Sequence, residues 1–162
     1  MSDGAPPARG RLLDRQRRNV LLLWIIALGL ANFVLYTLTY WYLGGDAPNG
    51  SASDGLYYLR GHFLWARAGK VSDPVSRGVW LYSYVHSITI WPTIAAVLVS
   101  MLILARPHII ATIKTDAPIR GQTFVAICMT VIVLLTSATT AFFILDFIKA
   151  LVTVADGGSY NV

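Results

Sequence analysis

Apolar residues in this chain are gathered into three long stretches, each free of Asp, Glu, Lys and Arg. The stretches run from Val20 to Leu43, from Ser83 to Ala105 and from Thr123 to Leu145. At 1.5 Å of rise per residue, each forms a helix of roughly 35 Å, longer than a hydrocarbon core of about 30 Å. A helix pairs its own backbone N–H and C=O groups, so it can cross that core. The pattern predicts an all-α integral membrane protein with three transmembrane helices.

The polar segments around these stretches define the rest of the organisation. The sequence predicts a flexible basic arm over 1–19, an outer loop of about 38 residues over 44–82, an inner loop over 106–122 and an outer tail over 152–162, with spans at 20–43, 83–105 and 123–145 inside a membrane domain covering 20–151. The chain outside the spans is too short for a second hydrophobic core of ordinary domain size. One membrane domain is therefore expected.

Composition supports a membrane environment, since 56% of the residues are hydrophobic and only 13% are charged. Soluble domains carry about 25% charged residues, so a water-soluble globule is not expected. The single cysteine, Cys128, rules out a disulfide within the chain. The net charge of +5 does not indicate nucleic-acid binding, because five arginines crowd just before the first span.

These arginines predict the orientation. Cytoplasmic flanks of membrane helices accumulate Lys and Arg, so the N-terminus is expected inside and, after three crossings, the C-terminus outside, in a bacterial inner membrane. The outer loop opposes this reading with four basic residues, Arg60, Arg67, Lys70 and Arg77. Aromatic side chains at the outer ends of the first two spans fit the interfacial belt of membrane proteins.

Polar and small residues inside the spans suggest how the helices pack. Asn32 stands near the middle of the first span, with Thr93 and Thr136 at similar depth in the others. An unsatisfied amide in hydrocarbon is costly, so Asn32 is expected to face a neighbouring helix. Small residues four apart allow close helix approach. The third span combines such a pair with hydroxyl groups and is expected to be the most buried helix; its packing residues are Thr136, Ser137, Thr140 and Ala141.

Asp146 and Lys149 lie three residues apart at the outer end of the third span. On a helix, residues at this spacing are neighbours on one face, so the sequence predicts a local ion pair or a Lys149 side chain that snorkels to the interface. The alternative is that the two charges dock against a partner protein.

Histidines offer the only candidate cofactor ligands. His86 lies about one turn into the second span and His62 lies in the outer loop, so the two could hold haem b or a quinone near the outer face. The chain contains no Glu, no phosphate-binding glycine loop and no nucleophile elbow. An enzyme and a metal cluster are therefore not expected, and an interfacial hydrogen bond is the simpler role for His86.

The leading hypothesis is a small non-catalytic membrane protein. It would act as an accessory or assembly subunit of a larger membrane complex, or as a helix-packed homo-oligomer, with the bilayer and other subunits or itself as partners. One alternative is a haem- or quinone-binding redox protein that uses His86. Another is an oligomeric pore lined by Asn32, although the absence of a carboxylate in mid-membrane argues against ion relay.

Overall fold

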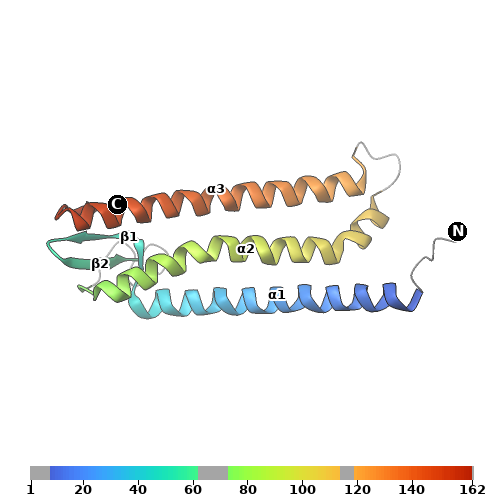
Figure 1. Ribbon diagram of the computed structural model, residues 1–162, viewed down its shortest axis with the longest axis horizontal. Helices are drawn as coiled ribbons and strands as arrows, with labels where there is room; N and C mark the ends of the chain where they lie inside the picture. The colour runs from blue at the N-terminus through green and yellow to red at the C-terminus, as the bar shows by residue number, and fades with distance from the viewer. Residues whose placement is uncertain (1–7, 62–72, 114–118, 162) are drawn as a thin grey trace, which may run out of the picture.

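Three long helices and a small sheet make up the computed structural model, which describes residues 8–61, 73–113 and 119–161. The elements are α1 (Ala8–Leu43), β1 (Asp46–Ser53), β2 (Leu56–Arg60), α2 (Arg77–Thr112), α3 (Gly121–Ala155) and β3 (Tyr160–Asn161) (Figure 1). Each helix is long and apolar enough to cross a membrane. The three predicted helices are therefore confirmed, and the sheet is an addition to the all-α prediction. The predicted arm over 1–19 is only partly described, and its last twelve residues belong to α1.

The helices lie in one layer with α2 in the middle, between α1 and α3 (Figure 1). Helix α2 has seven buried residues and α3 has four. The expectation that the third helix is the most buried is therefore wrong. The central helix is covered on two sides, whereas α3 packs on one side only.

At the end of the molecule opposite the sheet, helices α2 and α3 extend into the predicted inner loop, 106–122. Helix α2 continues through Pro107 to Thr112, and α3 begins at Gly121, so most of the predicted inner loop is helical. A proline inside a helix removes one backbone hydrogen bond. The last turn is nevertheless paired, because the Ile113 N–H donates to the Ile109 carbonyl at 3.1 Å.

The predicted outer loop holds a β-hairpin. Strands β1 and β2 are antiparallel and are joined by Asp54 and Gly55, both with positive φ (52° and 74°). Asp-Gly is a preferred pair for such a two-residue turn. The turn-forming residues of 44–51 predict a loop, and this prediction is wrong because Asp46–Ser53 is a strand. A short hairpin between 56–59 and 63–65 is the other expectation for this segment, and its second half lies outside the described residues. Strand β1 has the turn-like sequence DAPNGSAS, and its place in the sheet depends on neighbours and not on its own propensity.

The predicted outer tail is also structured. Helix α3 continues to Ala155, and the Gly158 N–H then donates to the Thr153 carbonyl at 2.9 Å. Gly157 has φ of +73°, a conformation that glycine adopts without strain. This turn brings Tyr160 alongside Ala52 of β1, so the sheet has the order β2-β1-β3.

The compact core lies where the sheet covers the ends of the helices, here named the sheet end. Its buried residues are Ala47, Ala52, Leu59, Trp80, Tyr84, Ala150 and Tyr160. Along the rest of the helices many large apolar side chains are exposed, for example Leu28 and Leu135, both at 64%. The buried core at the sheet end and the exposed apolar side chains along the helices fit an integral membrane protein with a small folded region outside the hydrocarbon core.

Candidate functional site: the polar cluster at the sheet end

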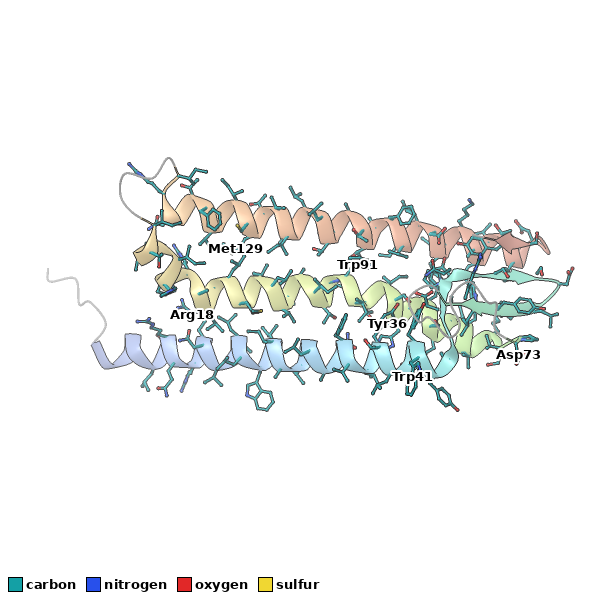
Figure 2. All side chains as sticks on the ribbon, turned by 180° about the vertical axis from the view of Figure 1, so that it is seen from behind. Arg18, Tyr36, Trp41, Asp73, Trp91 and Met129 are labelled. Atoms are coloured by element: carbon teal, nitrogen blue, oxygen red, sulfur yellow. The ribbon has the colours of Figure 1, made fainter. Side chains whose placement is uncertain are left out.

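Polar side chains from all three helices and from the sheet converge at the sheet end. They form two groups, one around Asp146 of α3 and one around Asp46 of β1. Figure 2 shows Tyr36, which belongs to the second group, between α1 and α2 near this end. Both carboxylates accept hydrogen bonds from tyrosine hydroxyls.

The Asp146 group joins α2, α3 and β3. The hydroxyls of Tyr84 and Tyr160 both donate to Oδ2 of Asp146, at 2.5 and 2.7 Å, and the two hydroxyl oxygens lie 3.1 Å apart. Tyr84 is fully buried and Tyr160 is 5% exposed. Hydrogen bonds to a charged acceptor are stronger than neutral ones. Asp146 therefore ties the C-terminal strand to the first turns of α2.

Tyr160 keeps its proton to an unusually high pH. Burial raises the pKa of its hydroxyl, and the hydrogen bond to Asp146 raises it further, to about 12, although the contact with Tyr84 acts in the opposite direction. An unperturbed tyrosine has a pKa of about 10. The neutral phenol is thus the form that the folded sheet end accommodates.

The Asp46 group joins α1, β1 and α2. The Tyr36 hydroxyl donates to one carboxylate oxygen at 3.1 Å, and the Asn49 amide donates to the other at 2.7 Å. The Ser83 hydroxyl accepts the N–H of Ala47 at 3.0 Å, which holds the start of β1 against α2. Asp46 is only 6% exposed, so these bonds replace most of its hydration.

His86 borders a small cavity beside the Asp46 group. The cavity has a volume of about 10 Å³, close to what one water molecule needs. The His86 ring is 8% exposed and lies between Tyr36 and Tyr82, with ring centroids 5.3 and 5.4 Å away. Its Nδ1 atom is buried and has no hydrogen-bond partner among the residues described here. The expected hydrogen bond from His86 is therefore not present in the described part of the chain.

Asn32 makes the interhelical contact that its mid-span position suggested. Its amide donates to the Thr93 hydroxyl of α2 at 3.1 Å. Close approach of the helices here depends on Gly29, where a Cβ atom would collide with Val97. Asn32 is partly buried, and its side-chain amide is engaged with α2.

The small and hydroxyl residues predicted to pack on α3 do not hydrogen-bond to a neighbouring helix. The hydroxyls of Thr136 and Thr140 donate to carbonyls of their own helix, those of Ile132 and Thr136, at 2.6 and 2.7 Å. Ser137 and Ala141 are exposed, on a different face from the buried Thr136. This small-residue face is not covered by any described part of the chain.

The predicted ion pair between Asp146 and Lys149 is wrong. Asp146 and Lys149, both described, form no ion pair; two tyrosine hydroxyls donate to Oδ2 of Asp146, and Lys149 is exposed. Tyr84 and Tyr160 come from distant parts of the sequence, so the i, i+3 spacing alone gave no sign of them. His62, the second candidate cofactor ligand, lies outside the described residues. Within residues 8–61, 73–113 and 119–161, no three His, Cys or Asp side chains are grouped to hold a metal ion.

Sequence reasoning missed Asp46, Tyr36, Tyr84 and Tyr160 as site residues. Three of them are tyrosines, two of which lie at the outer ends of the first two spans, where an interfacial belt explains them equally well. The useful signal was the phenolic hydroxyl, which usually finds a hydrogen-bond partner when it is buried. Comparisons of the chain with protein-family models, with curated proteins and with solved structures gave no significant match.

Replacing Asp146 by Ala is expected to destabilise the protein by about 2–3 kcal/mol, because two buried hydroxyls lose their charged acceptor. Titration of the unfolding of purified protein in mild detergent with sodium dodecyl sulfate measures this change. Asp156→Ala is the matched control, since Asp156 is exposed at the end of the same helix. Equal stability of the two variants would contradict the assigned role of Asp146.

Tyr160 is expected to make stability depend on alkaline pH. Its folded pKa lies above the unfolded value, so its contribution is complete below about pH 10 and is lost as the pH rises through about 12. The stability difference between wild type and Tyr160→Phe should therefore be large at pH 8 and should shrink towards pH 12. A difference that stays constant over this range would show that the phenol does not titrate as described.

Proposed function

We propose that this protein is a non-catalytic integral membrane subunit that associates laterally with other transmembrane helices, either of a larger complex or of a second copy. The main support is the single-layer arrangement, in which α1 and α3 pack against α2 and their remaining faces are exposed. A closed bundle would instead bury small and polar residues of all its helices inside.

The exposed face of α3 supports this proposal further. Ala126, Thr130, Ser137 and Ala141 recur at helical spacing on that face, and all four are exposed. Small side chains allow backbones to approach closely, which is the main source of helix association in lipid. Val133 and Ile144 are exposed on the same face, at 48% and 41%, so small and branched side chains share a surface on which another helix can pack.

The distribution of charge supports an orientation. The described side chains include five arginines and one acid at the end opposite the sheet, and five Asp and three basic residues at the sheet end. Basic residues favour the cytoplasmic side. We therefore place the N-terminus inside and the sheet outside, in a bacterial cytoplasmic membrane.

Photo-crosslinking in native membranes tests the lateral contact. Leu134 and Leu135 are equally exposed, at 63% and 64%, but point 100° apart on α3, and only Leu134 borders the small-residue face. With p-benzoylphenylalanine at position 134 we expect protein adducts that are absent or at least fivefold weaker with the same group at 135. The mass added to the 17.8 kDa chain distinguishes self-association from a different partner.

Ser137→Leu should abolish the adduct formed from position 134, since a bulky side chain keeps the partner helix away. Protein adducts of equal yield at 134 and 135, or adducts to lipid alone at both positions, would overturn the proposal. Insertion of each variant into the membrane is checked by its resistance to alkaline extraction.

Ligand binding at His86 is the second candidate function, favoured by its buried and unpaired Nδ1 atom. The adjoining cavity of about 10 Å³ is far smaller than a haem or a quinone ring, so binding would require α1 and α2 to separate at this end. A haem-binding protein should show a Soret absorption band after purification from haem-supplemented cells. The band should be lost in His86→Ala and kept in His108→Ala, and a colourless wild-type protein would contradict haem binding.

A pore lined by Asn32 has less support, because the Asn32 amide already donates to Thr93. This hydrogen bond links α1 and α2 of the same chain. Protection of an Asn32→Cys variant from water-soluble thiol reagents would count against a pore.

A further inference from the structure

Exposed arginines gather at the end of the molecule opposite the sheet, here named the basic end. They are Arg15, Arg17 and Arg18 of α1, Arg106 of α2 and Arg120 just before α3. Asp14 is the one acidic side chain that the structure describes there. The described surface at the basic end therefore has a strongly positive potential.

The helix register brings arginines of two helices to the same level. Asn32 of α1 bonds to Thr93 of the antiparallel α2. Fourteen residues further towards the basic end, roughly 21 Å along both axes, lie Arg18 of α1 and Pro107 of α2. Arg106 is thus within one residue of the level of Arg18, and Arg18 lies between α1 and α2 in Figure 2.

Arg106 is nine residues, or 180°, from Val97, which packs against Gly29 of α1, so it lies on the face of α2 turned away from α1. The arginines beside α1 are therefore those of α1 itself.

An open apolar groove on α1 begins at Arg17. It has a volume of about 420 Å³ and is lined by Leu13, Gln16, Arg17, Val20, Leu21 and Trp24. Trp24 is 61% exposed and lies seven residues from Arg17, about 10 Å along the helix. Along α1, the cationic side chain of Arg17 is therefore followed, towards the middle of the span, by the open apolar surface of the groove.

We propose that the basic end binds an anionic phospholipid, with the phosphodiester headgroup held by Arg17 and Arg18 and an acyl chain lying along Leu21 and Trp24. Guanidinium groups bind phosphate oxygens through paired hydrogen bonds. Basic residues next to a membrane helix attract anionic headgroups. The site goes beyond the proposed lateral association, because it needs no protein partner.

The arginines determine which lipid is selected. Any lipid chain can cover the groove of α1, but a zwitterionic headgroup places its own cation near the guanidinium groups. Each basic residue close to an anionic surface favours binding by about fivefold. The two arginines Arg17 and Arg18 should therefore give a clear preference for the anionic lipid.

Quenching of Trp24 fluorescence by brominated acyl chains tests the site. The full chain is reconstituted in phosphatidylcholine vesicles with a small fraction of brominated phosphatidylglycerol or, in parallel, brominated phosphatidylcholine. The Trp24 signal is the difference between wild type and Trp24→Phe. We expect the brominated anionic lipid to quench this signal at least fivefold more effectively than the zwitterionic one at equal mole fraction.

Two variants and one competitor complete the experiment. Arg17→Gln combined with Arg18→Gln should remove most of the preference, and Lys149→Gln, at the sheet end, should leave it unchanged. Equal quenching by the two lipids in wild type would overturn the proposal without any variant. So would a preference that survives the double substitution, or one that inorganic phosphate abolishes, since the latter indicates a soluble anion site.

Discussion

The first turns of α2 hold the sheet end together, because successive side chains there bind three different neighbours. Ser83 accepts a backbone N–H of β1, and Tyr84 donates to Asp146 of α3. The Ser87 hydroxyl donates to the Ser83 carbonyl at 2.9 Å and also lies 3.5 Å from the Tyr36 hydroxyl of α1. Trp80, one turn earlier, is 1% exposed and fills the apolar core under the sheet. Buried polar groups without partners are costly, so these bonds require α2 to lie between α1 and α3.

The three long helices and the contact of Asn32 with a neighbouring helix could be predicted from the sequence. Uncharged stretches of more than twenty residues leave the helix as the only simple way to satisfy the backbone in hydrocarbon. The amide of Asn32 had few partners available at its depth, and Thr93 was one of them. In both cases the constraint was the cost of an unpaired polar group in hydrocarbon, which acts on the backbone of a long segment and on the amide of Asn32.

The sheet end could not be predicted in the same way. Strand β1 contains Pro48, Asn49 and Gly50, which are typical of turns, and it is a strand because β2 and β3 pair with it. Gly50 has no room for a side chain, since a Cβ atom there would collide with the Tyr58 carbonyl. The Asp54-Gly55 turn was the one local signal of a hairpin. The pairing of Asp146 with two tyrosines depends on a fold that the i, i+3 spacing to Lys149 does not encode.

The two ends of the molecule differ in how much of their chemistry is already satisfied. At the sheet end, Asp146 and Asp46 accept bonds from within the chain, and the described core is closed over them. At the basic end, the described arginines are exposed, and Asp14 is the one acid among the described side chains. A ligand of opposite charge is therefore expected at the basic end more than at the sheet end.

Lateral association and lipid binding can occur together, because they use different helices. The small-residue face belongs to α3 and the lipid groove to α1, and α2 lies between these helices. A partner helix on α3 need not displace a lipid on α1. The free energies of the two contacts should then be nearly additive, as is usual for sites that are well separated and share no residues. Coupling between the two sites would have to pass through α2. Helix α2 packs closely against Gly29 of α1 and against the core of the sheet end, so it has little freedom to change between two arrangements.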